Sequence, residues 1–298
     1  MKPLQARDYG DARLFVCEIE QKVLGFANRM DKKKDYTSRS LAAFVDELQA
    51  QGRYTFTRAD AADAEKYSGV AIEAALRRLR RRGRIAIPRR GFYVLIPLEY
   101  REAECPPASW FIDDFMRFFN QPYYVGLLSA AAIHGAAHQQ PMVFQIVTDR
   151  PTRPARAGRV RISFHKSRSI GKLPVVEVQT ETGSMRVSTP EATAFDLVRF
   201  APVAGRLNNV ATVLSELAEK LEAKALVKIA RYYTVPDVQR TGYLLEMLGE
   251  QDLAKPLADW LATRRYRPIL LAPGKTIAKV PADPRWRVIP NEKLETDL

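Results

Sequence analysis

One stretch near the N-terminus decides the fold of its surroundings: SGVAIEAALRRLRRRGRIAIPRRGFYVLIP, residues 68–97. Its first half has an apolar stripe at helical spacing, made by Ile72, Ala75, Leu76 and Leu79. Gly83 ends that pattern, and Ser68 precedes it as a suitable N-cap. The second half is two β-rich runs, 84–87 and 92–96, around a Pro-Arg-Arg-Gly turn. The stretch therefore predicts a helix followed by a hairpin.

Two further helices are predicted directly upstream. The first has an apolar stripe at positions i, i+3, i+4 and i+7, formed by Leu41, Phe44, Val45 and Leu48, and ends at Gly52. The second is the Ala-rich segment 59–66, where Thr57 and Asp60 stand at capping-box spacing. Three helices and a two-stranded wing over residues 38–97 predict a winged helix-turn-helix domain.

The charge of this region predicts a polyanionic partner. The 298-residue chain carries a net charge of +13, and residues 66–90 contain nine basic side chains and one acidic one. The face of the third helix opposite its apolar stripe is the one that we expect to contact the DNA bases. It consists of Ala74, Arg77, Arg78 and Arg81. Arg89 and Arg90 at the wing tip are assigned to the DNA backbone or minor groove. The predicted DNA-binding set is completed by Lys66, Ser68 and Arg84.

A solvated charged face, or a surface for RNA or protein, is the alternative to duplex DNA. The coincidence of fold pattern and charge placement favours double-stranded DNA. Because one winged helix reads only a short site, we expect the DNA site to contain repeats.

The rest of the chain predicts a larger mixed α+β domain, which makes the fold class α+β overall. A chain of this length favours two domains, and the predicted boundaries are an N-terminal helical extension over 1–37, the winged helix over 38–97, a Pro-containing linker over 98–107 and the C-terminal domain over 108–298. The C-terminal strands are predicted at 143–147, 160–164, 175–178 and 185–188. Its helices are predicted at 110–120, 126–137, 191–200, 208–221, 225–233, 238–248 and 256–263. Two cysteines and no apolar membrane span predict a cytoplasmic protein that contacts no membrane.

Two segments of the C-terminal domain resemble a known family. They are YYVGLLSAAAIHGAAHQQP at 123–141, followed by QIVT at 145–148, and VSTPEATAFDLV at 187–198. In these segments the chain looks like AbiEi, the antitoxin and transcriptional repressor of the AbiE abortive-infection systems, which are type IV toxin–antitoxin pairs that act in phage defence. The resemblance spans about residues 38–263. It implies autoregulation of a shared operon by the winged helix, and neutralisation of a cognate nucleotidyltransferase toxin by the C-terminal domain, with direct contact left open. Within the two segments we assign the antitoxin function to His134, His138, Thr193 and Asp196.

The sequence gives little support to a metal site or a phosphate-binding loop. His134 and His138 have the i, i+4 spacing of zinc ligands, but Gly135 stands where a metalloprotease has its Glu. Gly274-Lys275-Thr276 resembles the end of a phosphate loop, but Ile269 replaces its first glycine. We therefore predict no metal, no cofactor, no catalytic residues and no enzymatic activity. The alternative is a DNA-processing enzyme, a nuclease or nucleotidyltransferase, whose winged helix delivers the substrate.

Overall fold

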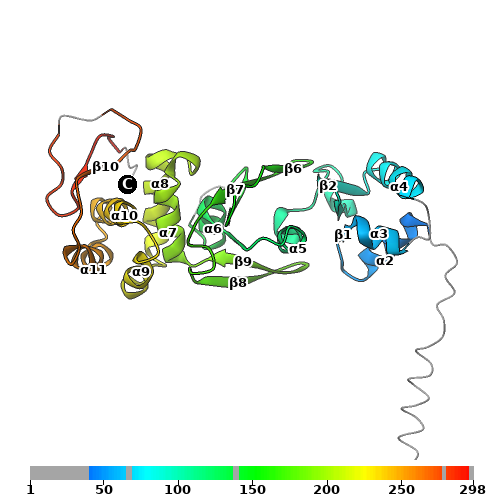
Figure 1. The fold of residues 1–298 in the computed structure, drawn as a ribbon, viewed down its shortest axis with the longest axis horizontal. Helices are drawn as coiled ribbons and strands as arrows, with labels where there is room; N and C mark the ends of the chain where they lie inside the picture. Colours follow the sequence, from blue (N-terminus) through cyan, green and yellow to red (C-terminus); the bar gives the residue numbers. More distant parts are fainter. Residues whose placement is uncertain (1–39, 65–68, 137–140, 277–279, 295–298) are drawn as a thin grey trace, which may run out of the picture. The chain divides into compact units, whose positions relative to one another are not determined.

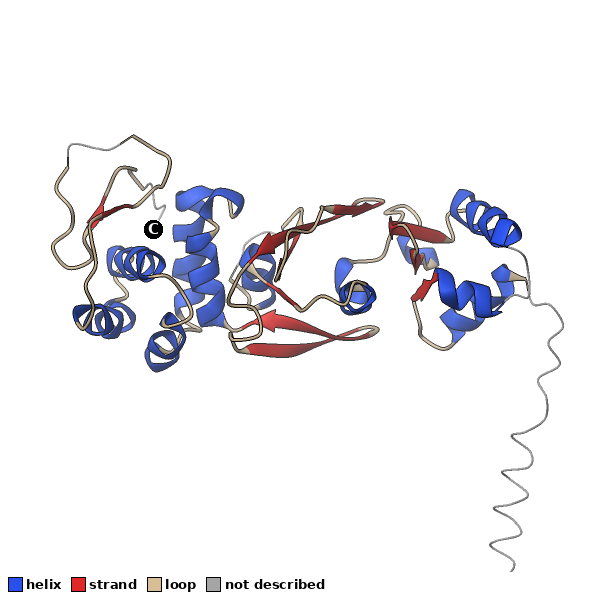
Figure 2. Cartoon of the chain, viewed as in Figure 1, coloured by secondary structure: helices blue, strands red, loops and turns tan. Residues whose placement is uncertain are grey.

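The computed structural model describes residues 40–64, 69–136, 141–276 and 280–294. Lys66, Ser68, His138 and the predicted extension 1–37 lie outside these ranges. Figure 1 traces the chain by sequence, and Figure 2 separates its helices from its strands. Among the described residues, no helix has both the length and the apolar character needed to cross a membrane. The α+β fold class is confirmed.

The N-terminal region is a winged helix, as predicted. Helices α2 (Leu41–Ala50), α3 (Arg58–Ala64) and α4 (Gly69–Arg81) pack beside a sheet of β1 (Thr55–Thr57), β2 (Ile85–Arg89) and β3 (Phe92–Leu95). The strand order is β1-β3-β2, with both pairings antiparallel. Strand β1 was not predicted. The core of this region takes the inward faces of all three helices, with Leu41, Leu76 and Phe56 buried.

Local hydrogen bonds explain where these elements begin. The Ser40 hydroxyl accepts from the Ala43 backbone N–H and so caps α2. Thr57 and Asp60 bond reciprocally: the Asp60 carboxylate accepts from the Thr57 backbone N–H at 2.7 Å, and the Thr57 hydroxyl accepts from the Asp60 N–H at 3.2 Å. The predicted capping box is confirmed. Gly91, at φ +89°, makes the tight turn between β2 and β3.

The centre of the larger region is a six-stranded mixed sheet. Its order is β6-β7-β5-β4-β9-β8, with β5 parallel to β7 and β4 parallel to β9. The strands are β4 (Tyr123–Val125), β5 (Phe144–Thr148), β6 (Ala155–Ala157), β7 (Val160–Lys166), β8 (Val175–Thr180) and β9 (Gly183–Ser188). The four predicted strands are confirmed as β5, β7, β8 and β9, while β4 and β6 were not predicted.

Helices accompany this sheet and extend beyond it. Helices α5 (Ile112–Phe118) and α6 (Leu127–Ile133) contact β9 and β5, respectively. Helix α7 (Pro190–Arg199) is capped by Thr189, whose hydroxyl accepts from the Ala192 N–H. It contacts α6, α8 (Arg206–Ala218), α9 (Ala223–Ala230) and α10 (Val235–Met247). Helix α11 (Gln251–Ala262) and the short parallel pair β10 (Ile269–Leu270) and β11 (Val288–Ile289) complete the described chain.

The wing shares a hydrophobic cluster with the larger region. Phe92 of β3 lies 5.2 Å from Phe115 of α5, centroid to centroid, and both side chains are buried. The Thr55 hydroxyl donates to the Asp114 carboxylate at 2.5 Å. In the segment predicted as a linker, Cys105 is buried in the same cluster. Most of the predicted linker 98–107 is exposed, and the chain on either side of it contributes to this one cluster.

Candidate DNA-binding surface and the buried polar cluster

Helix α4 divides into a buried face and a basic face. The four residues of its predicted apolar stripe, Ile72, Ala75, Leu76 and Leu79, are all buried. Arg77, Arg78 and Arg81 are exposed, and Ala74 is half-buried. None of these three arginines forms an ion pair with a described residue. Their guanidinium groups are thus available to a partner.

The other three arginines of the predicted DNA-binding set, Arg84, Arg89 and Arg90, differ in their contacts within the protein. Arg84 forms a salt bridge of 2.5 Å with Asp46, which ties the start of β2 to α2. Arg89 donates a hydrogen bond to the Arg153 carbonyl oxygen, and its guanidinium lies 5.9 Å from the Phe119 ring centroid. Arg90 is exposed in the turn of the wing. Arg84 and Arg89 therefore hold parts of the protein together, whereas Arg90 is free at the tip.

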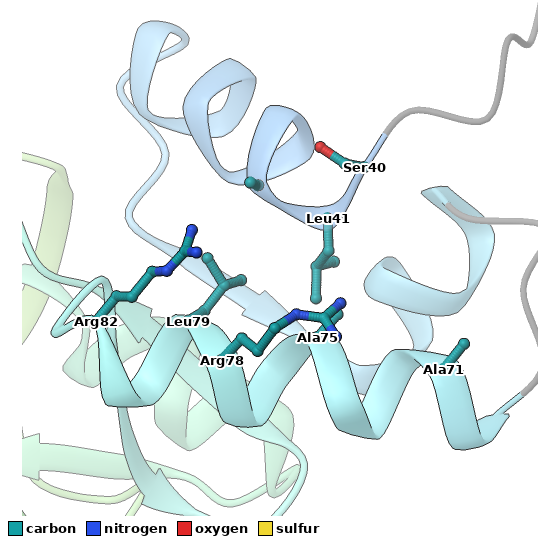
Figure 3. A pocket seen from close by; sticks show the side chains of 8 residues that line it. Ser40, Leu41, Ala71, Ala75, Arg78, Leu79 and Arg82 are labelled. Carbon is teal, nitrogen blue, oxygen red and sulfur yellow. The ribbon is translucent and has the colours of Figure 1, made fainter.

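A hollow of about 440 Å³ lies between α2 and α4 (Figure 3). Ser40 and Leu41, at the start of α2, form one side, and Ala71, Ala75 and Leu79 of α4 form the other. Arg78 and Arg82 also line it. Neither Arg82 nor Ser40 belongs to the DNA-binding set predicted from the sequence. Helix N-termini and arginines are common donors to DNA phosphates, so this hollow suits a backbone phosphate beside the base-reading face.

The described residues among those assigned to antitoxin function, His134, Thr193 and Asp196, take part in buried or partly buried polar contacts. A ring nitrogen of His134, Nε2, lies 2.7 Å from the Ser188 carbonyl oxygen. The Ser188 and Thr193 hydroxyls lie 2.7 Å apart, and the Thr193 hydroxyl also donates to the Thr189 carbonyl oxygen at 2.9 Å. Thr193 is completely buried, so it reaches a toxin only if the fold opens. In the structure it joins α7 to β9.

Asp196 is buried on α7 and accepts hydrogen bonds from two tyrosines. The Tyr124 hydroxyl donates to its Oδ2 at 2.9 Å, and the Tyr233 hydroxyl donates to its Oδ1 at 3.0 Å. Burial raises the pKa of the Asp196 carboxyl to about 7, although the two hydrogen bonds work in the opposite direction. The two tyrosines lie far from Asp196 in sequence, and no local pattern singles them out.

Between about pH 4 and pH 7 the Asp196 carboxyl is protonated in the folded protein and ionised in the unfolded chain. The contribution of Asp196 to the free energy of unfolding is therefore full below about pH 4 and is lost as the pH rises through 7. The neutral form suits the site, since the Tyr233 hydroxyl also lies 3.1 Å from the Ala192 carbonyl oxygen and can donate there. We expect Asp196→Asn to match this neutral form. Relative to wild type, its free energy of unfolding should rise between about pH 4 and pH 7 in urea titrations and level off at higher pH. A stability difference that stays constant with pH contradicts this assignment.

Metal ligation has no support in the described ranges, where no group of three or more His, Cys, Asp and Glu side chains is placed to hold an ion. His165, the third histidine, lies 5.6 Å from the Phe200 ring and bonds Ser163. Burial lowers the pKa of His165.

Comparison with known proteins places both regions in one family. The model of the AbiEi antitoxin C-terminal domain matches residues 124–247, and that of the AbiEi antitoxin transcriptional regulator matches residues 44–96. No curated protein matches the chain. A crystal structure of the RV2827C protein from Mycobacterium tuberculosis aligns with a TM-score of 0.62 at 18% identity, covering 85% of this chain and 92% of that one, which shows a shared fold. With a regulator domain followed by an antitoxin domain, the chain belongs to the AbiEi antitoxin family.

Proposed function

We propose that the protein represses its own toxin–antitoxin operon by binding repeated operator sequences through α4 and the wing, and that it neutralises a cognate nucleotidyltransferase toxin through its C-terminal region. The observation that carries the first part is the exposed face of Arg77, Arg78 and Arg81, which bears no internal ion pair among described residues and belongs to a matched regulator domain.

The chemistry of this face suits duplex DNA. Arginine presents a planar fork that matches the two acceptors of guanine in the major groove. Ala74, at the same face, is small enough to let the helix approach the base edges and can contact a thymine methyl group. Arg90 at the wing and the Arg78–Arg82 hollow supply contacts to phosphates.

The second part rests on the match of residues 124–247 to the antitoxin domain. Thr193 and Asp196 support it by holding the domain together, since their side chains are buried and bonded to neighbouring elements. The toxin would meet the domain through other, exposed residues, or would be countered without direct contact.

Full-length variants can separate the two activities, which avoids cutting the shared cluster around Phe92 and Phe115. Toxin and antitoxin are expressed from unrelated promoters, and a reporter carries the native operator. We expect the double variant Arg77→Ala, Arg81→Ala to lose reporter repression and still rescue growth, because these side chains lie outside the antitoxin domain. Loss of rescue together with loss of repression, at equal protein level, contradicts the proposed division.

A further inference from the structure

A pocket of about 410 Å³ lies in the helical part of the C-terminal region. Its wall is built from the end of α7, the start of α8, the middle of α10 and the segment that follows β10; α7, α8, α10 and β10 are labelled in Figure 1. A volume of this size falls within the range of small-molecule sites, roughly 300 to 1,000 Å³.

Four basic side chains from separate segments line this pocket: Arg199, Arg206, Arg240 and Lys275. Glu292 is the acidic residue among the described lining residues, and its carboxylate is already paired with Lys275 at 2.9 Å. The three arginines form no ion pair with a described residue. The Arg240 Nε donates to the Leu270 carbonyl oxygen at 3.0 Å, which fixes the guanidinium in place. Among the described lining residues the four cations outnumber the one carboxylate, so the pocket attracts an anion.

The backbone conformation of Arg206 is a second observation that points to a binding site here. Arg206 has φ +67° and follows Gly205, which has φ +82°. A residue with a Cβ is disfavoured in this left-handed region, where glycine is the usual occupant. Strained residues of this kind gather at binding sites, and here the strain holds a cationic side chain at the pocket.

The rest of the pocket wall is apolar. Pro202 and Pro273 line it and are exposed, whereas the lining residues Val198, Leu207 and Leu271 are almost fully buried. A ligand that fits both halves has a phosphate group for the arginines and a planar, weakly polar ring for the apolar wall.

We propose that this pocket binds a nucleotide, with its phosphates held by Arg199, Arg206 and Arg240 and its base against the exposed Pro202 and Pro273. The proposal goes beyond operator binding and toxin neutralisation, because the proposed function assigns no role to this pocket. A bound nucleotide would bridge α7, α8 and α10 and so stabilise the antitoxin domain.

Isothermal titration of the full chain with ATP, adenosine and inorganic pyrophosphate tests this. We expect ATP to bind with a Kd below about 1 mM, pyrophosphate to bind at least about tenfold more weakly, and adenosine alone to give no measurable heat. Arg206→Gly is the decisive variant, because glycine is unstrained at positive φ. The variant should keep or raise the Tm while its ATP affinity falls at least about tenfold.

Arg240→Met removes a second positive charge and keeps a similar side-chain length. We expect its ATP affinity to fall by the same factor as that of Arg206→Gly. The control is Arg159→Gln, which removes one charge from an arginine whose side chain is 71% exposed and far from the pocket lining, and should bind ATP as wild type does. Absence of ATP binding, unchanged affinity in Arg206→Gly, or pyrophosphate binding as tight as ATP overturns the nucleotide assignment. Because Arg77→Ala, Arg81→Ala leaves this pocket intact, it should bind ATP normally even if operator binding proves wrong.

Discussion

Alanine at both Arg77 and Arg81 is expected to weaken operator binding by roughly 30-fold to 10,000-fold, because each specific arginine–base contact contributes about 1 to 3 kcal/mol. Both side chains are exposed on α4 and lack internal ion pairs within the described chain, so their loss should leave folding unchanged. Affinity for random DNA should fall much less. The measurement is a gel shift with operator and random duplexes at fixed ionic strength, together with a footprint that should show repeated protected sites.

Salt dependence gives the same surface a second signature. If about six phosphates are neutralised, wild-type affinity should fall by about a thousandfold between 50 and 200 mM salt. Arg159→Ala removes an exposed arginine outside the winged helix and serves as the control, with affinity close to wild type. Equal losses on operator and random DNA for Arg77→Ala, Arg81→Ala would show that α4 contacts only the DNA backbone. A single unrepeated footprint would refute the predicted operator.

Gly242→Ala should cost about 3 kcal/mol or more of unfolding free energy. A Cβ at this position of α10 would lie 2.0 Å from Cζ3 of Trp286, which is completely buried. The indole cannot move aside cheaply, because the Trp286 backbone N–H donates to Asp283 at 2.7 Å and its carbonyl oxygen accepts from Gln239 at 2.8 Å. Overpacking a rigid core typically costs about 1 to 3 kcal/mol, and this contact belongs at the upper end or above.

The expected readout is a Tm lower than wild type by roughly 6 to 12 °C. Gly69→Ala is the matched control, since the nearest atom to its new Cβ is 3.7 Å away and its φ is not positive. That control should change the Tm by little, or raise it slightly, because alanine favours helix. A Tm for Gly242→Ala that equals the Gly69→Ala value contradicts the close packing of Trp286 on α10.

Sequence reasoning succeeded where the signal is local. The α4 stripe and the Thr57–Asp60 cap each depend on residues within a turn or two of one another, so spacing alone identifies them. Strand β1 was missed because three residues between two helices show no alternation, and it forms only by pairing with β3. Strand β4, whose residues are all buried, has no alternation either.

The candidate sites divide in the same way. The exposed arginines of α4 follow from helical periodicity, but the engagement of Arg89 by the Arg153 carbonyl follows from contacts more than sixty residues apart. The two tyrosines on Asp196 come from β4 and from the segment before α10, and the basic pocket gathers side chains from residue 199 to residue 292. Such groupings are set by the path of the chain in space, which composition and spacing do not reveal.

The packing of Phe92 against Phe115 bears on how such proteins can exchange parts during evolution. A recombination event that joins the DNA-reading half of one homologue to the antitoxin half of another, with a crossover near residue 100, would pair a wing with a foreign α5. Because interiors tolerate few voids or overlaps, most such hybrids should fold poorly. Crossovers after α5 keep the aromatic pair together, so a change of operator specificity is most readily inherited along with residues 111–119.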